Sequence, residues 1–431
     1  MNNKLQKYNS YKNSGVEWLG NIPEHWEAKK IKHIFFEKKK STNVELNCGA
    51  ISFGKVIYKA DEKVPEATKK TYQVVSKGDF LINPINLNYD LQSLRTALSE
   101  IDVVVSSAYI VLNSNLKLSK EYYKWLLHLF DVVFMKTLGS GVRQTLSFNQ
   151  IANCELFFPP IQEQTTIANF LEDKTAKIDQ AITIKKNQIE LLKERRQNLI
   201  HKAVTRGLNN NVKLKTSGVE WIGEIPEGWV VKKLGYLANC FPSNIDKHSK
   251  VNEKEVRLCN YTDVYKNDYI TDDMDLMLAT ATEEQITKFT LKKGDIVITK
   301  DSETASDIAV PTYIKEDLTN VVCGYHLAMI RTYQRSYSKY LFRALQTKLF
   351  NIQFEVCSNG ITRVGLGSSD LKNGYFLVPS EKEQIEIAEF IEMGTTKIAK
   401  AISLKEQEID KLKEYKMSLI DSVVTGKIRV N

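Results

Sequence analysis

Two short motifs carry residue types that could do chemistry on a nucleic acid, and neither is complete. Asn83-Pro84-Ile85-Asn86 begins like the Asn-Pro-Pro-Tyr type of motif. It lacks the second proline and the aromatic residue that would stack on a flipped base. Glu37-Lys38-Lys39 places lysines after a carboxylate, but a metal-dependent nuclease needs several spaced carboxylates. Neither motif predicts a catalytic site.

Cofactor and nucleophile patterns are also missing. Gly426-Lys427 lacks the upstream glycine of a phosphate-binding loop, and Gly365-Leu366-Gly367 lacks the third glycine of a dinucleotide-binding turn. The six histidines have no Ser or Cys partner, and the six cysteines form no CxxC pair, so neither a zinc site nor a disulfide framework is indicated. We expect a chain that is not catalytic by itself and binds no metal or cofactor.

Composition narrows the class of protein. A chain of 431 residues, 42% hydrophobic and 26% charged, is globular in type and long enough for two or three domains. The net charge of +8 suits a polyanionic partner such as nucleic acid without requiring one. The first ten residues are polar, and no run of eighteen apolar residues occurs. We expect a cytoplasmic protein with no membrane contact.

The chain contains an internal repeat. Residues 14–26 read SGVEWLGNIPEHW and residues 217–229 read SGVEWIGEIPEGW, 203 positions later. Farther on, KGDFLI at 77–82 matches KGDIVI at 293–298, an offset of 216 that also relates Tyr109 to Tyr325. Arg143 and Leu146 then match Arg363 and Leu366 at an offset of 220. The growing offset indicates two similar scaffolds that carry different loops.

Each half is expected to have a short tryptophan-containing segment, a globular region and a long helix. Strand signals dominate the globular regions, as in 50–58, 103–112 and 321–331, with helical patterns near 120–135 and 338–354. The predicted fold class is therefore α+β, with two similar domains of mixed or antiparallel sheet and an internal pseudo-two-fold repeat. The predicted parts are residues 1–26, 27–158, 159–206, 207–229, 230–378 and 379–431.

The two long helices share an apolar seam. Every third or fourth residue from Leu171 to Ala203 is apolar except at three steps, and adding 220 to each number reproduces the pattern and the interruptions. This predicts that the two helices are each other's partner. The expected interface residues are Leu171, Ile178, Ile182, Ile189, Leu192, Leu199, Ile391, Ile398, Ile402, Ile409, Leu412 and Leu419.

The interruptions also predict the direction of the pair. Parallel packing would set Lys185 against Lys405 and Arg196 against Lys416, which costs energy. In an antiparallel register Lys185 faces Ile409, so that the cation lays its stem on an aliphatic side chain and keeps its head in water. The alternative is two unrelated surface helices, each covering a local core, which leaves the matched interruptions unexplained.

These features together resemble the specificity (S) subunit of type I restriction-modification enzymes. The resemblance rests on the twofold SGVEWxGxIPxxW motif, the two diverged regions, and two long helices that open with a Glu-Gln pair and carry Lys177-Ile178 or Lys397-Ile398. It covers nearly the whole chain. It implies two target recognition domains that each read one half of a split DNA site, set apart by an antiparallel coiled-coil-like spacer.

The same resemblance implies the partners. Two methyltransferase subunits would dock on the S subunit for adenine methylation, and motor-nuclease subunits would join for restriction. S-adenosylmethionine, ATP and Mg²⁺ would then be used in the partner subunits and not by this chain. Two other classes stay open: a stand-alone bipartite DNA-binding or scaffold protein, and a self-contained modification enzyme, against which the missing cofactor and Asn-Pro-Pro-Tyr motifs argue.

Reading base edges requires Arg, Lys, Asn or Gln, with further polar groups on phosphates. Polar loops after predicted strands supply the candidates, although each of these residues could instead belong to a solvated turn. In the first region they are Asn86, Asn88, Gln92, Arg95, Arg143 and Gln144, and in the second Lys300, Ser302, Thr304, Thr362 and Arg363. The four repeated tryptophans are expected to pack the segment that contains them onto its own domain or onto the long helices.

Overall fold

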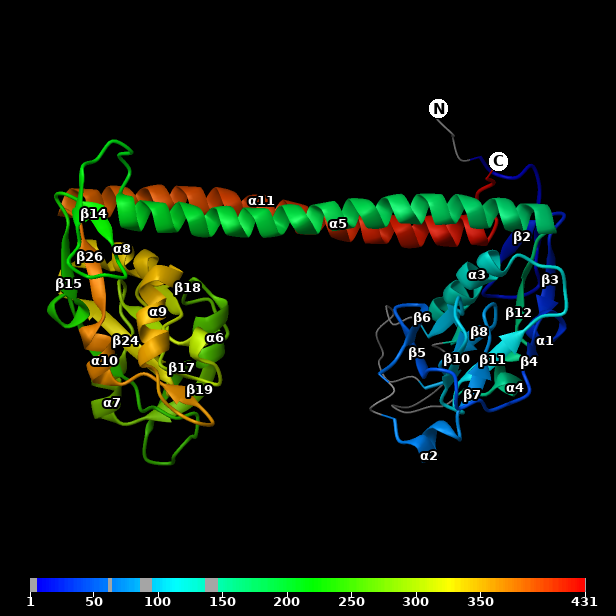
Figure 1. Cartoon of the computed structure of the whole chain (residues 1–431), viewed down its shortest axis with the longest axis horizontal. Helices are drawn as coiled ribbons and strands as arrows, with labels where there is room; N and C mark the ends of the chain where they lie inside the picture. The colour runs from blue at the N-terminus through cyan, green and yellow to red at the C-terminus, as the bar shows by residue number, and fades with distance from the viewer. Residues whose placement is uncertain (1–5, 61–63, 86–94, 136–145, 431) are drawn as a thin grey trace. The chain divides into compact units, whose positions relative to one another are not determined.

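The computed structural model describes residues 6–60, 64–85, 95–135 and 146–430. The chain divides into two compact units, Met1–Lys185 with Gln407–Asn431, and Lys186–Glu406. Each unit therefore holds one globular region, the first part of one long helix and the last part of the other (Figure 1).

The first unit is built on a six-stranded mixed sheet with the order β4-β11-β8-β9-β6-β5. These strands are β4 Phe36–Glu37, β5 Gly49–Ser52, β6 Lys55–Tyr58, β8 Phe80–Ile82, β9 Thr96–Leu98 and β11 Ile110–Asn113. All neighbours are antiparallel except β6 and β9. The antiparallel pairs are β1 Tyr11–Asn13 with β2 Asn21–Pro23, β3 Glu27–Lys30 with β12 Glu155–Phe158, and β7 Gln73–Val75 with β10 Val103–Val105. The helices are α1 Ile31–Ile34, α2 Glu66–Lys69, α3 Lys120–Val133 and α4 Phe148–Ile151.

The second unit repeats this plan with different elaborations. Its main sheet has the order β16-β24-β20-β22-β18, from β16 Ala238–Pro242, β18 Tyr269–Ile270, β20 Ile296–Thr299, β22 Pro311–Ile314 and β24 Leu327–Thr332. A second sheet has the order β19-β17-β23, from β17 Lys254–Cys259, β19 Met277–Ala281 and β23 Val321–Cys323. The strand pairs are β13 Leu214–Thr216 with β14 Glu224–Pro226, β15 Val230–Lys233 with β26 Tyr375–Val378, and β21 Asp301–Ser302 with β25 Val364–Gly365. The helices are α6 Tyr261–Lys266, α7 Glu283–Phe289, α8 Arg335–Leu345, α9 Lys348–Cys357 and α10 Ser368–Asn373, with 3-10 turns η3 Leu234–Tyr236 and η4 Ala305–Asp307.

The predicted α+β class with mixed sheets is confirmed, while several strands are shorter than the sequence pattern predicted. The segment 50–58 is a hairpin and not one strand, because Phe53 and Gly54 turn the chain with positive φ angles of 46° and 73°. The segments 103–112 and 321–331 each contain two strands with a turn between them. The expected helix at 338–354 is divided between α8 and α9. At the break between them, Thr347 Oγ1 donates a hydrogen bond to the Ala344 carbonyl.

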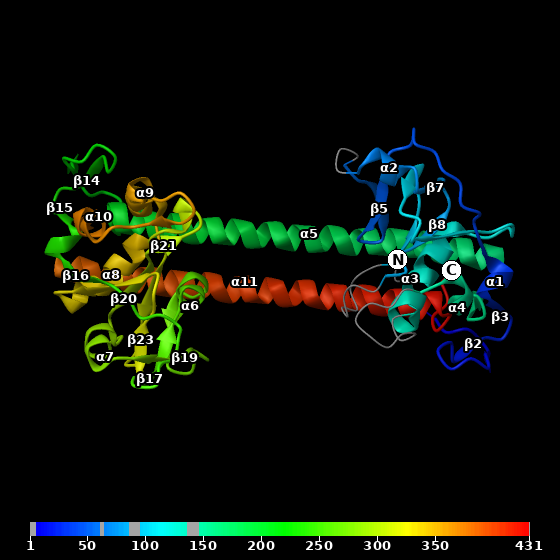
Figure 2. The same cartoon turned by 90° about the horizontal axis from the view of Figure 1, so that it is seen from below.

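The two long helices are α5, Ile161–Arg206, and α11, Glu381–Val424, drawn next to each other in both views (Figures 1 and 2). In the first unit Lys185 pairs with Glu408 at 2.6 Å and Lys416 pairs with Asp179 at 2.7 Å. Residue numbers fall along α11 as they rise along α5, so the predicted antiparallel direction is confirmed. In the second unit a Cβ on Gly394 would lie 2.6 Å from Leu199 Cδ1. The Lys185 and Leu199 contacts both lie within one residue of the assumed register.

Every predicted seam position is buried or half-buried, whereas most positions between them are exposed. Cations of the seam form ion pairs in addition to extending into water. Lys185 and Lys416 pair with carboxylates of the opposite helix, and Arg196 pairs with Asp268 of its own unit. Opposite charges along the helix pair add to the apolar seam in fixing its register.

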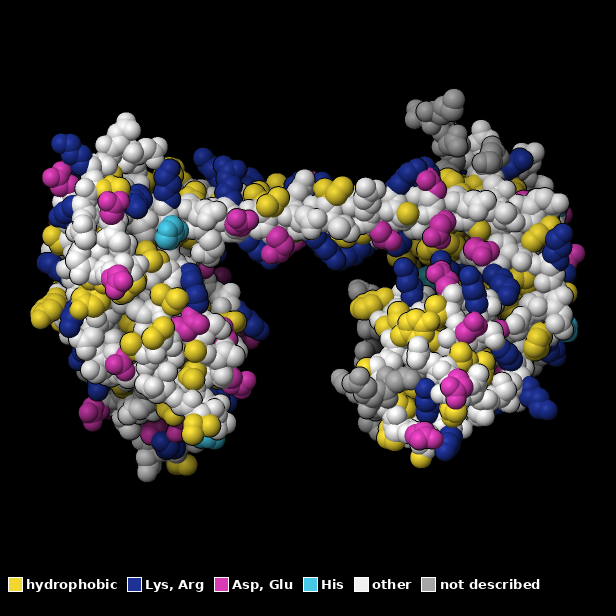
Figure 3. All heavy atoms as spheres, viewed as in Figure 1, with side chains coloured by type: hydrophobic (Ala, Val, Ile, Leu, Met, Phe, Trp, Pro, Cys, Tyr) yellow, Lys and Arg dark blue, Asp and Glu magenta, His cyan; other side chains and the backbone are white. Residues whose placement is uncertain are grey.

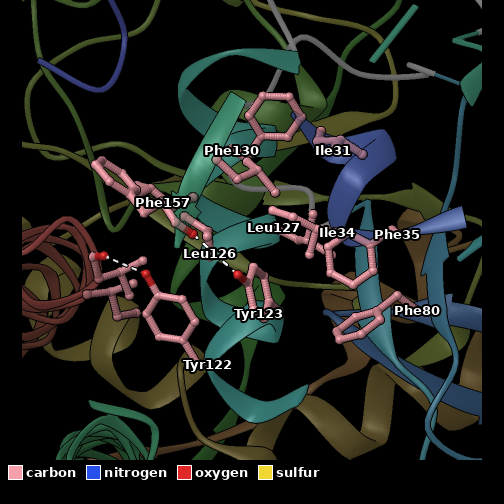
Figure 4. Close-up of a cluster of buried hydrophobic side chains, with 14 of the residues drawn as sticks. Ile31, Ile34, Phe35, Phe80, Tyr122, Tyr123, Leu126, Leu127, Phe130 and Phe157 are labelled. Atoms are coloured by element: carbon pink, nitrogen blue, oxygen red, sulfur yellow. Dashed lines mark hydrogen bonds between the residues drawn. The ribbon is translucent and has the colours of Figure 1, made fainter. Parts of the chain in front are cut away.

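The largest core cluster of each unit includes residues of both long helices. In the first unit, aromatic residues of α3 pack against the sheet and against α1, as Figure 4 shows for Tyr123 and Phe130. The buried Tyr122 hydroxyl donates to the carbonyl of Val424, at the end of α11. In the second unit Tyr340 on α8 donates in the same way to Val204, at the end of α5. Each globular region thus fixes the C-terminal end of the long helix that belongs to the other half.

The repeated tryptophans anchor the start of the nearer helix. Trp26 Nε1 donates to Glu163 Oε2 at 3.0 Å, and Trp229 Nε1 donates to Glu383 Oε1 at 3.3 Å. Both rings are buried. Trp18 packs its ring against Phe130 at a centroid distance of 5.3 Å. The expectation that these residues pack their segments onto the domain and the long helices agrees with these contacts.

Candidate nucleic-acid interface

Four of the five polar candidates of the second region gather around one hollow of about 1140 Å³ in the second unit. Ser302, Thr304 and Arg363 line it, and Lys300 reaches it through an ion pair with Asp301 at 2.6 Å. Thr362 is exposed beside Arg363 in the chain. Other lining residues include Asn260, Tyr261, Tyr265, Tyr325 and His326, together with the acids Asp246, Asp301, Glu303 and Asp307. Polar edges and aromatic faces in one concavity are what contact with bases and sugars requires.

Three chain segments build this hollow through their backbones. Lys300 follows the buried strand β20, and its amide donates to the carbonyl of His326 at 2.8 Å. The Lys300 carbonyl accepts from Leu366 at 2.9 Å, which ties down the segment that carries Arg363. Because main-chain hydrogen bonds join the segments, the side chains around the hollow start from fixed positions.

Asp301 is the centre of the charge pattern. Its carboxylate accepts from Lys300 Nζ at 2.6 Å and lies 2.9 Å from His326 Nδ1. Burial raises the pKa of Asp301, but the hydrogen bonds from Lys300 and His326 outweigh that effect and hold the pKa below its usual value. Asp301 is therefore an anion at neutral pH.

The hydroxyl candidates are partly used inside the protein. Ser302 is 6% exposed, and its Oγ lies 3.0 Å from the hydroxyl of Tyr261. Thr304 Oγ1 donates to Asp307 Oδ2 at 2.8 Å. Arg363 is exposed, and its Nη1 lies 2.8 Å from His326 Nε2. Among the five candidates of this region, Arg363 combines exposure with a defined orientation.

Sequence reasoning missed Asp301, Tyr325 and His326 as members of this site. The histidine was set aside because no catalytic partner stood near it in the sequence, and the repeat marked only Tyr325, through Tyr109. A usable signal was present in Gly324-Tyr325-His326, which interrupts an otherwise apolar run from 321 to 330. Such an interruption predicts a turn at the edge of a sheet.

In the first unit most candidates fall outside the described residues, namely Asn86, Asn88, Gln92, Arg143 and Gln144. The described residues next to them repeat one contact of the second unit. Leu146 donates its amide to the carbonyl of Pro84 at 3.1 Å, as Leu366 does to Lys300. The two halves therefore make the same main-chain contact just after corresponding strands.

The structure does not support Arg95 as a residue that contacts DNA. Its side chain is 5% exposed, and Nε and Nη2 donate to Asp131 Oδ1 at 2.9 and 2.6 Å. Asp131 is fully buried on α3. A buried arginine that satisfies a buried carboxylate connects β9 to α3, so its position in a predicted loop was misleading.

The described parts of the chain contain no group of three or more His, Cys, Asp or Glu residues that could hold a metal ion. No helix among the described residues is long and apolar enough to cross a membrane.

The fold and the site together define a class, an internally duplicated two-domain protein whose halves share a scaffold and differ in their loops. Comparison with known proteins identifies the family. The model of the type I restriction modification DNA specificity domain matches residues 23–194 and 226–414, so the chain belongs to that family, with the domain present twice.

Relatives of the same kind span the whole chain. It is 22% identical to the type I restriction enzyme MjaVIII specificity subunit of Methanocaldococcus jannaschii, with 95% of this chain and 94% of that protein covered. It is 23% identical to the putative MjaX specificity subunit of the same organism, with 96% of each covered. Both alignments span the two halves of the internal repeat.

Solved structures show the same fold. A chain from a study of complex assembly and conformational transition of the type I R-M system matches with a TM-score of 0.69 and 13% identity, covering 94% of this chain and 98% of that one. The HsdS subunit from Thermoanaerobacter tengcongensis matches with a TM-score of 0.51 and 14% identity at the same coverage. The long-helix architecture is therefore shared at low sequence identity.

Proposed function

We propose that this chain reads a split, asymmetric double-stranded DNA target, one half-site with each globular region, and contributes that specificity to a type I restriction-modification complex. The family supports the class of function. The observation that carries the asymmetry is the hollow of the second unit: Asp301 and His326 face it, while the positions 216 residues earlier are Ile85 and Ile110. Isoleucine cannot make the polar contacts of Asp or His, so the two halves should read different bases.

The long helices serve as the spacer between the two readers. In each unit they run antiparallel, and α5 and α11 have 46 and 44 residues. In this proposal the two half-sites are assigned to the two similar halves of the chain, as a dimer assigns them to its two subunits. Helix length is then the property that sets the gap between the half-sites.

Affinity for the DNA backbone is supplied by charge that is spread over the surface. Figure 3 shows Lys and Arg side chains scattered over both units and mixed with Asp and Glu on the face seen there. The net charge is +8. Such a moderate excess gives a salt-dependent contribution to binding and leaves the choice of sequence to the loops.

Chemistry on the DNA belongs to partner subunits in this proposal. Two methyltransferase subunits would use S-adenosylmethionine, and motor-nuclease subunits would use ATP and Mg²⁺. The present chain would contribute recognition and a docking frame. This assignment accords with the incomplete catalytic motifs in its sequence.

Mapping N6-methyladenine across the host genome, with and without the gene, tests the proposal. Deletion should abolish methylation at one split motif, and expression of the gene from a plasmid should restore it. If deletion abolishes methylation at no split motif, the result contradicts the proposal. To cover a silent locus, the tagged chain is also purified. Full sequence specificity without a co-purifying methyltransferase would instead favour a stand-alone bipartite DNA-binding protein.

A further inference from the structure

We infer that Arg363 reads a guanine in the half-site of the second unit, and that Asp301 and His326 are positioning residues that orient its guanidinium. The inference rests on the proposed function and names the side chains that would determine specificity in that unit. It follows from a chain of contacts along the hollow, from the frame that holds them, and from the donors that remain free on the arginine.

The contacts define which nitrogen of His326 carries the proton. Nδ1 lies 2.9 Å from Asp301 Oδ2, and an ionised carboxylate only accepts hydrogen bonds. Nδ1 therefore donates to Asp301, which leaves a lone pair on Nε2. Arg363 Nη1 lies 2.8 Å from Nε2 and donates to it. Asp301 thus fixes the tautomer that gives Arg363 an acceptor.

The contacts from Asp301 through His326 to Arg363 form a relay, and the backbone holds His326 in the position that this relay needs. Its φ angle is 70°, in the left-handed region that residues other than Gly uncommonly adopt, although Asn, Asp and His do so more often than most. The carbonyl of His326 accepts from the amides of Lys300 at 2.8 Å and Asp301 at 3.2 Å. These bonds stabilise the unusual conformation and place the imidazole beside the Asp301 carboxylate.

A glycine allows the loop of Arg363 to approach. Gly365 pairs with Asp301 between β25 and β21, and a Cβ on Gly365 would lie 2.8 Å from Asp301 Oδ1. Any larger residue would push the loop and Arg363 away from the relay. The close approach and the relay are therefore parts of one arrangement.

The free donors of Arg363 indicate the ligand. A guanidinium has five N–H groups, and His326 takes one of them. The remaining fork can donate in parallel to O6 and N7 of guanine, the commonest specific contact of arginine in the major groove. A contact with phosphate tolerates many orientations of the side chain. The fixed orientation favours reading of a base over contact with the backbone.

Randomised DNA duplexes selected with the full-length chain, in the complex purified through it, test the inference. Arg363→Ala should reduce the preference for one G·C pair in one half-site by about 10-fold or more and leave the other half-site unchanged. Asp301→Asn and His326→Asn should weaken the preference at that same pair. Asparagine accepts the left-handed φ angle, so His326→Asn keeps the turn.

The control is Arg335→Ala, which removes an exposed arginine of the same unit outside the hollow. It should leave both half-sites unchanged. The double variant Asp301→Asn/Arg363→Ala should be no worse than Arg363→Ala alone, because a positioning residue acts only through the side chain that it orients. A merely structural role for Asp301 would add its own loss to the double variant.

The outcomes separate the inference from the proposed function. If the unsubstituted complex selects no split motif, the proposed function fails. If it selects a split motif that Arg363→Ala leaves intact, the inference alone is overturned. An equal loss of affinity for all sequences, with a salt slope lower by about one unit, would assign Arg363 to a phosphate and also overturn it.

Discussion

Replacing Arg95 by alanine should destabilise the first unit and leave the DNA sequence preference unchanged. The guanidinium makes two hydrogen bonds to Asp131 Oδ1, at 2.9 and 2.6 Å, and the Arg95 amide donates to Oδ2 at 3.2 Å. Both side chains are buried, 5% exposed for Arg95 and fully buried for Asp131. The substitution leaves the Asp131 carboxylate in the core without its cation.

The magnitude follows from that burial. Removing one partner of a buried ion pair costs about 3–5 kcal/mol, whereas replacing both partners by apolar residues of similar volume is often close to neutral. Arg95→Ala should therefore lower the free energy of unfolding of the first unit by about 3–5 kcal/mol. The double variant Arg95→Met/Asp131→Leu should recover most of that loss. An exposed control, Arg335→Ala, should stay within about 0.5 kcal/mol of the unsubstituted protein.

Urea denaturation of the full chain measures the loss. Hydrogen exchange of peptides from β9 and α3 reports the first unit by itself, which matters because two units need not unfold together. A result that refutes the reasoning is an Arg95→Ala protein of unchanged stability whose preference in one half-site has shifted. Arg95 would then contact DNA, as the sequence pattern suggested.

Four other perturbations test the remaining parts of the account. Exchange of residues 27–158 for another recognition domain should alter one half-site in the methylation motif; a change in both would contradict one domain per half-site. Insertion of about one heptad in each long helix should change the gap and keep both half-site sequences, as read from the same motif. Tyr340→Phe leaves the buried carbonyl of Val204 without its donor, so thermal unfolding should reveal a loss of about 1–3 kcal/mol; unchanged unfolding would mean that the end of α5 has another partner. Burial raises the pKa of Glu163, but hydrogen bonds from Trp26, His25 and Tyr8 outweigh that effect and lower the pKa. The lowered pKa stabilises the folded protein above the unfolded pKa near 4.5, and this stability is lost as the pH falls through the folded pKa. Glu163→Gln should therefore flatten the acid limb of a curve of unfolding free energy against pH.

The repeat was readable from the sequence because its signals are local. SGVEWxGxIPxxW recurs with its tryptophans in place, and the structure gives both copies the same role, a buried indole that donates to the first turn of a long helix. The direction of the helix pair was also readable. Like charges at matched seam positions disfavour a parallel pair, and Lys185 and Lys416 pair with acids of the opposite helix instead.

Turns were harder to predict, because their backbone conformations are set by neighbouring segments. Apolar runs such as 103–112 and 321–331 look like single strands, yet each folds into two. Nothing local in the sequence requires His326 to adopt a left-handed conformation. Hydrogen bonds from Lys300 and Asp301, 26 and 25 residues away in the chain, stabilise it there.

The sequence alone determined the duplication, the pairing of the two long helices and the absence of complete catalytic motifs, since each depends on periodicity or spacing along the chain. Tertiary structure decided which polar residues are free to contact a ligand. Arg95 and Arg363 both lie in loops predicted from the sequence. Only folding puts Asp131 beside the first and His326 beside the second, so burial makes one arginine part of the core and leaves the other at the surface with donors to spare.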